Sequence, residues 1–409
     1  MDARDAAQAI YRAALLAADG RQRTFEWLHR HAMEPQVWAV AVGKAAPAMA
    51  EGASEALGSR LSRGLLVTKH GHLRPNSADG PFECYQTGHP VPDAVSLGAG
   101  RRLLEFIAEA PPGVHWLFLV SGGASSLVEV LPEGQTLHDL QRAQHWLLGS
   151  GLAITEINRI RKGLSLIKGG RLAMRLAGQD VTVLMISDVP GDDPTVVGSG
   201  LLAAAPADRD LSGLALPGWL RAQLDGAPPA PDPDHPALAR VHHHVIASLE
   251  DARRGAVRKA RELGLDAVCH RSRLAGDATA VGHRLGALTR EASAGVQVWG
   301  GETTVILPPD PGRGGRCQQL ALAAALELQG IPDSCLLAAG TDGTDGPTED
   351  AGAIVDGGTV ARGLRSGFTA EFCLTRADAG TFLEASGDLL QTGPTGTNVN
   401  DLVVTVKMQ

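Results

Sequence analysis

Short runs of valine, leucine and isoleucine alternate with longer segments of helical periodicity along the whole sequence. This alternation predicts an α/β fold in parallel layers, because strands that helices cover on both faces are apolar throughout. The predicted strands are Val37–Val42, Gly64–Thr68, Trp116–Val120, Val181–Ser187, His243–Ala247, Val296–Trp299, Cys335–Ala339 and Leu402–Val406. The predicted helices are Ala6–Ala17, Ala45–Leu57, Ala94–Ala108, Ile154–Leu164, Leu249–Glu262, Thr279–Ala292 and Arg316–Leu328.

A proline-rich segment between Ala203 and Ala239 interrupts this pattern near the middle of the chain. Its prolines are Pro206, Pro217, Pro228, Pro229, Pro231, Pro233 and Pro236. Proline ends both helices and central strands, so such a segment marks a domain boundary. Since 409 residues exceed the usual size of one domain, we expect two, spanning residues 1–235 and 236–409.

Charge and composition exclude several classes of partner. Lysine and arginine total 37 against 45 aspartate and glutamate, and the net charge of −8 offers no basic surface for nucleic acid or an anionic membrane. No apolar stretch approaches the roughly 18 residues that a membrane span needs. The five cysteines form no C-x-x-C pair, which favours reduced thiols in the cytoplasm. We therefore expect small-molecule partners and no membrane. We also expect a homodimer, because homodimers are the most common oligomers of proteins.

Glycine-rich loops follow the predicted strands, at the edge where α/β sheets collect their ligands. Gly43-Lys44 follows the strand Val37–Val42 and opens a helix, which sets an ammonium group beside free N–H donors. This arrangement suits an anion. The alternative is a solvated lysine at a tight turn.

A second such loop follows the strand Trp116–Val120 and contains Ser121, Gly122, Gly123 and Ser125. Paired glycines flanked by hydroxyls let the backbone fold into a nest of N–H groups that cradles phosphate or carboxylate. An ordinary strand-to-helix turn has a similar composition. No G-x-G-x-x-G stands after any predicted strand, which argues against a Rossmann dinucleotide site.

Three carboxylates, Asp188, Asp192 and Asp193, stand within six residues after the strand Val181–Ser187. Such acids repel one another unless a cation compensates them, so we interpret them as ligands of Mg²⁺. Turn formation and helix capping by aspartate are the alternative. A basic helical stretch lies nearby in the sequence, and its Arg161, Lys162 and Lys168 either face an anion or are solvated.

The second half carries four more polar loops. Arg313 and Arg316 stand among glycines immediately before a helix, and a planar guanidinium in such a frame suits phosphate. Thr341, Asp342 and Asp345 follow the strand Cys335–Ala339. The latter loop is similar to calcium loops but lacks the glutamate at the twelfth position, so we discount calcium. The remaining loops are Gly300–Thr304 and Thr392–Asp401. Together these loops predict an anion site between two domains.

Several of these strings resemble one family. They are AVGKAAPAMA, GHPVPD, SGGASSL, RKGLSLIKGGRLA, ISDVPGDDP, GGETTV, GRGGR, GTDGTDGPT and TGPTGTNVNDL, in order from about Val37 to Val404. They resemble the glycerate 2-kinases with a C-terminal MOFRL domain, whose members are often labelled hydroxypyruvate reductases. The resemblance implies two α/β domains, the first Rossmann-like and doubly wound, with an interdomain cleft.

The resemblance also implies an activity, the ATP- and Mg²⁺-dependent phosphorylation of D-glycerate to 2-phospho-D-glycerate. Lys44 and Arg316 match the catalytically important lysine and arginine of the family. The chain departs from the family's usual GGRNQE, because Cys317 and Gln319 stand where that string has asparagine and glutamate. We therefore expect different hydrogen bonding or substrate preference at this point.

The residues and the resemblance lead to the same predicted mechanism. Phosphoryl transfer needs in-line positioning and cations around the transferred group, and we expect Lys44 and Arg316 to supply that charge from opposite domains. Asp188 is the first candidate for the base that accepts the glycerate hydroxyl proton. Two other functions stay open at this point. One is an NAD(P)H-dependent hydroxypyruvate reductase, and the other is a protein that only binds phosphorylated metabolites.

Overall fold

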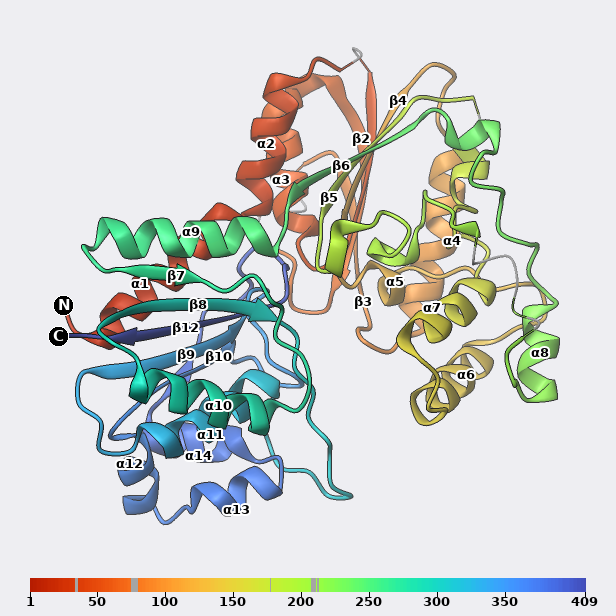
Figure 1. Cartoon of the computed structure of the whole chain (residues 1–409). Helices are drawn as coiled ribbons and strands as arrows, with labels where there is room; N and C mark the ends of the chain where they lie inside the picture. Colours follow the sequence, from red (N-terminus) through yellow and green to blue (C-terminus); the bar gives the residue numbers. More distant parts are fainter. Residues whose placement is uncertain (34–35, 75–79, 177, 207–210, 212) are drawn as a thin grey trace. The chain divides into compact units, whose positions relative to one another are not determined.

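The computed structural model describes residues 1–33, 36–74, 80–176, 178–206, 211 and 213–409. The chain folds into two compact units, which are described separately. Gly20–Ile246 form the contiguous unit, and Met1–Asp19 together with Ala247–Gln409 form the split unit (Figure 1). Both consist of a sheet and helices, which confirms the predicted α/β class.

The contiguous unit is built on a sheet with the strand order β3-β2-β1-β4-β5-β6. Pairing is parallel between β1 and β2, β1 and β4, β2 and β3, and β4 and β5. The order reverses at β1 and β4, as in doubly wound folds, so the Rossmann-like prediction is confirmed. The strands are β1 Val37–Val42, β2 Leu61–Lys69, β3 Phe82–Thr87, β4 His115–Ser121, β5 Val181–Ile186 and β6 Val241–Ala247.

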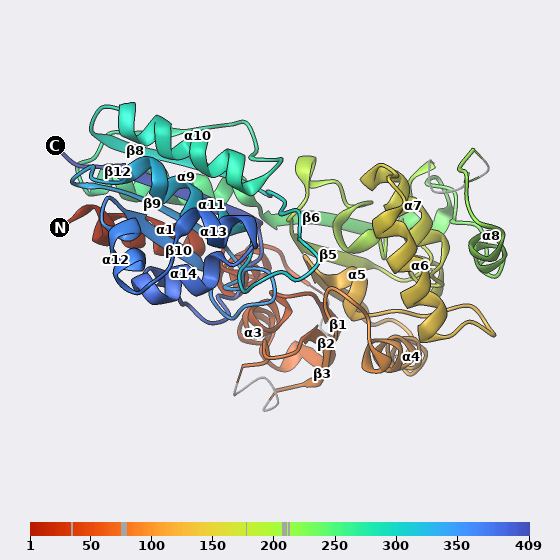
Figure 2. The same ribbon diagram turned by 90° about the horizontal axis from the view of Figure 1, so that it is seen from below.

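Helices cover both faces of this sheet, with α3 on one side and α4 on the other (Figure 2). Coverage on both faces explains why every residue of β1 and β5 is buried. Trp38, Phe106, Trp116 and Phe118 form the aromatic part of the core. The helices are α2 Gly20–Arg30, α3 Ala46–Leu57, α4 Ala94–Ala108, α5 Ala124–Leu127, α6 Leu137–Gly149, α7 Ile154–Gly163 and α8 Gly218–Leu224.

The sheet of the split unit has the order β11-β10-β9-β12-β8-β7. Strand β12 is antiparallel to both β8 and β9, and β10 is antiparallel to β9 and β11. Among the described strands of this sheet, only β7 and β8 pair in parallel. The expectation of parallel layers throughout is therefore wrong here. Since no helix separates β9 from β10, the chain returns beside itself in the opposite direction. The strands are β7 Ala267–Cys269, β8 Gly295–Gly301, β9 Ser334–Gly340, β10 Gly352–Asp356, β11 Leu389–Leu390 and β12 Asp401–Lys407.

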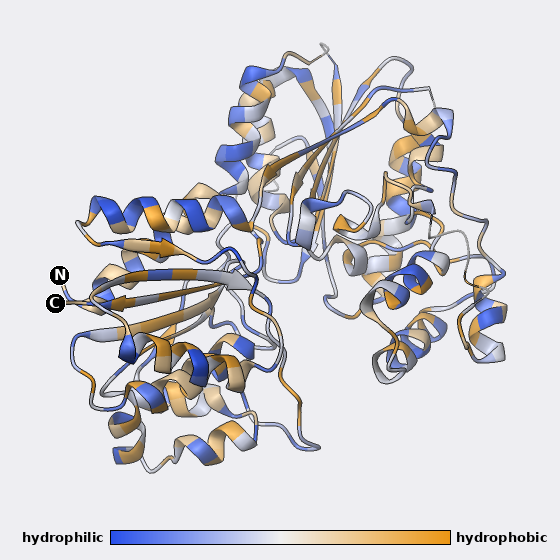
Figure 3. Ribbon diagram, viewed as in Figure 1, coloured by the Kyte–Doolittle hydropathy of each residue, from blue (hydrophilic) through white to orange (hydrophobic). Residues whose placement is uncertain are grey.

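Helices α1 and α9 pack on one face of this second sheet, and α10 and α11 pack on the other (Figure 1). The strands of both sheets are among the most hydrophobic parts of the ribbon (Figure 3). No helix of the described residues is long and apolar enough to cross a membrane. The helices are α1 Ala3–Ala17, α9 Leu249–Glu262, α10 Ala278–Glu291, α11 Arg316–Leu328, α12 Thr359–Arg365, α13 Ala370–Thr375 and α14 Ala379–Ser386.

The division between the units differs from the expected boundary at residue 235. It falls after Ile246, because β6 follows the proline-rich segment and still joins the first sheet beside β5. Helix α1 belongs to the split unit, because its apolar face with Ile10 and Ala14 packs on α9, β9 and β12. Residues 207–210 and 212 of the proline-rich segment lie outside the described residues.

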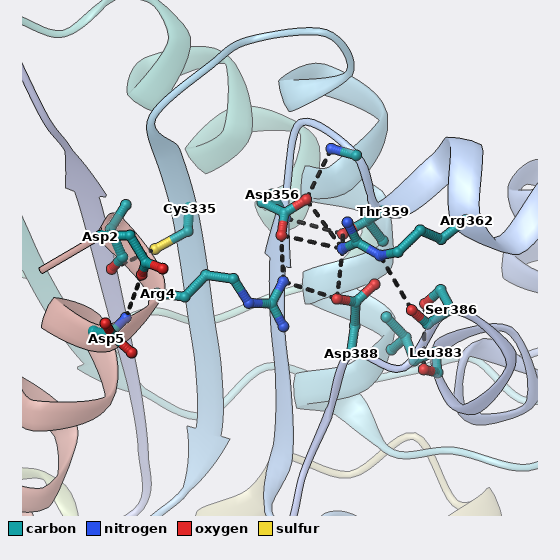
Figure 4. A network of polar contacts seen from close by, with 12 residues as sticks. Asp2, Arg4, Asp5, Cys335, Asp356, Thr359, Arg362, Leu383, Ser386 and Asp388 are labelled. Atoms are coloured by element: carbon teal, nitrogen blue, oxygen red, sulfur yellow. Dashed lines mark hydrogen bonds and ion pairs between the residues drawn. The ribbon is translucent and has the colours of Figure 1, made fainter.

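Ion pairs attach the start of α1 to the split unit (Figure 4). Arg4 binds the carboxylates of Asp356 and Asp388, and Arg362 binds the same two carboxylates. The Asp388 side chain is buried, so the two guanidinium groups compensate a charge that water does not reach. This network fixes the first turn of α1 to segments more than 350 residues later in the sequence.

Candidate active site

The loops that follow β1 and β4 interlock at the carboxyl edge of the first sheet. The N–H of Lys44 donates to the carbonyl of Gly122 (3.0 Å), and the N–H of Ala45 donates to the Ser121 hydroxyl (3.0 Å). Gly43 has φ of 135°, and a Cβ there would lie 2.1 Å from Ser121 Oγ. The position therefore requires glycine. The Ser121 hydroxyl stabilises the loop by accepting the hydrogen bond from Ala45.

Lys44 stands directly before the N-terminus of α3. That helix begins at Ala46 without a side-chain cap, so its first N–H groups carry the positive end of the helix dipole. A Cβ built on Gly123 would lie 3.1 Å from His89 Nε2 and 3.2 Å from Lys44 Cγ. The half-buried Lys44, His89 and the Gly123 backbone are thus neighbours, and the loop suits an anion.

Ser125 lies beside the segment that follows β5. Its hydroxyl and the hydroxyl of Ser199 are 2.7 Å apart. Ser199 has φ of 59° and stands between two glycines that also have positive φ. The structure therefore brings the loop after β4 together with the segment that follows the predicted acidic loop.

The three predicted metal ligands differ in their surroundings. Asp193 is exposed, and its Oδ1 accepts the N–H of Thr195 (2.8 Å), which is a turn-forming role. Asp192 has φ of 54°, and its Oδ1 is buried without a hydrogen-bond partner among the described residues. Asp188 is half-buried at the end of β5. Over the described part of the chain no three His, Cys, Asp or Glu side chains form a metal-binding group.

Lys168, a predicted binding residue, forms a buried ion pair with Glu129. The exposed fractions of the two side chains are 4% and 1%, and the Ser165 hydroxyl donates to Glu129 (2.5 Å). This pair commits the Lys168 ammonium to a carboxylate inside the protein and stabilises the segment after α7. Arg161 differs, because its buried Nε has no hydrogen-bond partner among the described residues, and burial lowers its pKa.

In the split unit, three polar loops meet at one edge of the sheet. Asp401, the first residue of β12, lies opposite Gly301 of β8 and Gly340 of β9. Because β12 is antiparallel to both neighbours, its beginning lies where β8 and β9 end. The loops Gly300–Thr304, 341–346 and 392–400 therefore converge at this edge.

Arg316 begins α11 and points its guanidinium at this edge. Its Nε and Nη2 bind the two carboxylate oxygens of Asp401 (2.6 and 2.9 Å), and Nη1 binds Glu302 (2.5 Å). Burial alone would lower the pKa of Arg316, but the charges of Asp401 and Glu302 outweigh it and raise the pKa. The two carboxylates fix the direction of the guanidinium group. The side chain is still 35% exposed, so the group is accessible to a ligand.

Asp345, a second predicted binding residue, is buried and caps α11. Its two carboxylate oxygens accept the N–H groups of Cys317 (3.0 Å) and Gln318 (2.8 Å). A Cβ on Gly315 would lie 2.3 Å from this carboxylate, so the close approach requires glycine. Burial and the neighbouring Asp401 raise the pKa of Asp345 to about 7. Asp345 thus positions the helix that carries Arg316.

The other predicted residues of this half are engaged within the protein. Arg313 forms ion pairs with Asp350 (2.8 Å) and Glu384 (2.6 Å). The Thr341 hydroxyl donates to the carbonyl of Asn400 (2.6 Å), which joins the loops after β9 and before β12. Asp342 accepts the N–H of Thr344 (3.0 Å). These contacts shape the loops around Arg316.

Sequence reasoning assigned no role to Glu302, Asp401 or Tyr11. Glu302 lies in the polar loop after β8 and Asp401 at the end of the polar loop before β12, but this position in the sequence does not reveal their pairing with Arg316. Tyr11 donates its hydroxyl to the Gly340 carbonyl (2.7 Å) from α1. No local pattern reveals that contact, because the two residues are 329 positions apart.

The two departures from the family string are both buried in α11. The Gln319 amide donates to Thr279 Oγ1 (3.1 Å) and to the carbonyl of Leu374 (2.9 Å). Burial raises the pKa of the Cys317 thiol, and the nearby Asp401 charge adds to the shift. Gln319 therefore links α11 to α10 and α13, and the thiol of Cys317 remains neutral.

Comparison with known proteins gives the family. The chain matches the domain of unknown function DUF4147 over residues 6–212 and the MOFRL family over residues 295–401. It is 40% identical to a D-glycerate 2-kinase of Thermotoga maritima over 89% of each chain. It is 34% identical to a glycerate 2-kinase of Pyrococcus horikoshii, over 91% of this chain and 87% of the relative.

A solved structure agrees with these relatives. The crystal structure of a glycerate kinase from Thermotoga maritima superposes with a TM-score of 0.83 at 36% identity, covering 99% of both chains. The fold and the sequence matches define an α/β enzyme that combines a DUF4147 region with a MOFRL region. The chain belongs to the glycerate kinase family.

Proposed function

We propose that the protein transfers the γ-phosphoryl group of ATP to the 2-hydroxyl of D-glycerate, giving 2-phospho-D-glycerate and ADP. The observation that carries the proposal is the fixed guanidinium of Arg316, held by Asp401 and Glu302 and still accessible. A fixed, planar donor pair is what a phosphoryl group with spreading negative charge requires. Family membership supports the same activity.

Lys44 is the second proposed catalytic cation. Its backbone is fixed by Gly122, and it stands at the uncapped start of α3. We propose that this ammonium and the N–H groups of the Gly122–Gly123 turn bind nucleotide phosphate oxygens. Ser125 is a proposed hydroxyl donor at the same edge of the first sheet.

Asp188 and Asp192 are the proposed acidic residues of the reaction. The buried Oδ1 of Asp192 has no hydrogen-bond partner among the described residues and fits a metal ligand. Mg²⁺ commonly takes one or two carboxylates and completes its shell with phosphates and water. Bound Mg²⁺ supplies positive charge to the nucleotide phosphates. Asp188 is the proposed base that accepts the proton of the 2-hydroxyl. Asp193 is left out, because it is exposed and caps a turn.

We also propose a cellular location and an oligomeric state for the enzyme. The five cysteines all lie within the described residues and form no disulfide, which fits the reducing cytoplasm. A homodimer is the proposed assembly, and light scattering of the purified protein would measure its mass.

Product analysis tests the proposed reaction. ATP, Mg²⁺ and D-glycerate are expected to yield ADP together with 2-phosphoglycerate, which phosphorus NMR separates from 3-phosphoglycerate. Lys44→Ala and Arg316→Ala are expected to lower kcat by about 100-fold or more without loss of folding. Near-normal kcat in both variants would contradict the assigned roles.

The two alternative functions, a hydroxypyruvate reductase and a protein that only binds metabolites, predict different results with the same purified protein. A hydroxypyruvate reductase oxidises NADH or NADPH when hydroxypyruvate is added, without any need for ATP. A protein that only binds phosphorylated metabolites gives no ADP with D-glycerate. Either result would replace the kinase proposal.

A further inference from the structure

A pocket of about 680 Å³ lies beside helix α9 in the split unit, and none of its lining residues belongs to the site described above. Arg254, Arg258 and Arg261 line it from α9, and Arg271 lines it from the segment after β7. Residues spaced by three and four share one face of a helix. Figure 1 shows α9 running alongside β7, the edge strand of the sheet.

The positive charge of this pocket is only partly compensated by the carboxylates that line it. Glu250 pairs with Arg254 (3.1 Å) and with the buried Arg253 (3.0 Å). The other lining carboxylate, Glu262, pairs with Lys259 (3.3 Å). Among the described residues, Arg258, Arg261 and Arg271 have no carboxylate within ion-pair distance. Three unneutralised guanidinium groups thus line one pocket of a chain whose net charge is −8.

The two walls of the pocket are fixed to each other. Arg253 donates from α9 to the carbonyl of His270 (2.8 Å), next to Arg271. The His270 ring stacks on Trp299 with centroids 4.4 Å apart, and its Nε2 is 2.9 Å from Gln297 Oε1. The backbone that carries Arg271 is therefore held in place before any ligand arrives, which lowers the entropic cost of binding.

We propose that this pocket binds a small polyanion with adjacent phosphate groups, using Arg258, Arg261 and Arg271 as its ligands. Guanidinium groups pair bidentately with phosphate oxygens, and three of them match more than one negative charge. A second copy of the chain is a poor alternative occupant. Pairing of two copies across the β7 edge by a two-fold axis would bring two such rows of arginine together, and like charges repel. The inference goes beyond the proposed reaction and uses none of its residues.

Cys269 provides a local readout, because it lines the pocket and is partly exposed. Its alkylation by iodoacetamide is followed by peptide mass spectrometry, with tripolyphosphate as the probe and sodium chloride at equal ionic strength as the reference. Cys84, partly exposed in the contiguous unit, is the internal control. Tripolyphosphate is expected to slow alkylation of Cys269 several-fold and to leave Cys84 unchanged. ATP in a second arm shows whether a nucleoside strengthens the same binding.

Two variants decide whether the arginines are responsible. The double variant Arg258→Gln/Arg261→Gln is expected to raise the half-protecting concentration at least tenfold. Arg365→Gln, an exposed arginine at the end of α12, is the matched control and is expected to keep wild-type protection. The proposal is overturned if tripolyphosphate does not protect Cys269, if sodium chloride protects it equally, or if the double variant keeps full protection. None of these outcomes depends on phosphoryl transfer.

Discussion

The hydroxyl of Tyr11 donates a 2.7 Å hydrogen bond to the carbonyl oxygen of Gly340. Tyr11 lies in α1, and Gly340 is the last residue of β9, directly before Thr341 and Asp342. Burial raises the pKa of Tyr11 well above its usual value, and nearby acidic groups including Asp342 add to the shift. The hydroxyl therefore stays protonated, and α1 supports the loop from the interior of the unit.

Tyr11→Phe tests this support. The variant removes the donor from a buried carbonyl and is expected to lower the free energy of unfolding by about 1–2 kcal/mol, as measured by urea denaturation. Tyr85→Phe is the matched control, because its hydroxyl binds Glu83 (2.8 Å) on a half-buried strand. Equal effects of the two substitutions would show that the Tyr11 contact has no special importance.

Two arginines of the same glycine-rich segment are expected to differ in function. Arg316→Lys loses the two-point contact with Asp401, and we expect kcat to fall about 100-fold while the protein stays folded. Arg313→Lys disturbs pairs with Asp350 and Glu384, so it is expected to lower stability modestly with kcat nearly unchanged. Steady-state kinetics with D-glycerate measures both, and a reversed order would contradict the assignment.

The pH dependence of stability is expected to report on Asp345. Because its pKa is raised from 3.8 to about 7, the folded state binds the proton more tightly than the unfolded state. The resulting stabilisation is fully present below pH 3.8 and is lost as the pH rises through about 7. Wild type is therefore expected to lose stability relative to Asp345→Asn over this interval.

Denaturation of both proteins at a series of pH values measures that difference. Asp310→Asn, which removes an exposed carboxylate, controls for the change in net charge. If the stability difference between wild type and Asp345→Asn is constant from pH 4 to 8, Asp345 does not bind a proton in the folded state.

Lys168 is expected to contribute to stability and not to binding. Lys168→Met leaves the buried Glu129 without its counter-charge, and we expect a loss of about 3–5 kcal/mol in unfolding free energy. Lys168→Met/Glu129→Gln removes both charges and is expected to recover part of that loss. A folded Lys168→Met protein with unchanged stability and a raised KM would instead return Lys168 to the substrate site.

The positions of strands and site loops were predictable where local pattern determines them. The buried strands β1 and β4 and the loops after them follow directly from apolar runs that end in glycine and polar residues. The prediction lacks β3, β7, β10 and β11. Strands β7 and β11 have only two or three residues and carry no periodicity. The antiparallel direction of β12 was also missed, since an apolar run does not encode which neighbour it pairs with.

Side-chain roles were harder to predict than loop positions. Arg313 and Arg316 occupy equivalent glycine frames in the sequence, and only the fold shows that one faces Asp350 and the other Asp401. The charge of Lys168 is visible in the sequence and indicates a binding role, whereas its burial beside Glu129 is visible only in the fold. Partner choice over long sequence separations is set by tertiary packing.

The topology of the split unit also determines the order in which parts of the chain can fold during translation. Strand β12 lies inside its sheet, between β8 and β9, although it is translated after both. Helix α1 leaves the ribosome before α9, β9 and β12, yet it packs on the surface that these elements form. Gly20–Ile246 can therefore collapse while translation continues, and the amino-terminal helix must wait with its apolar face uncovered until the last strand is available.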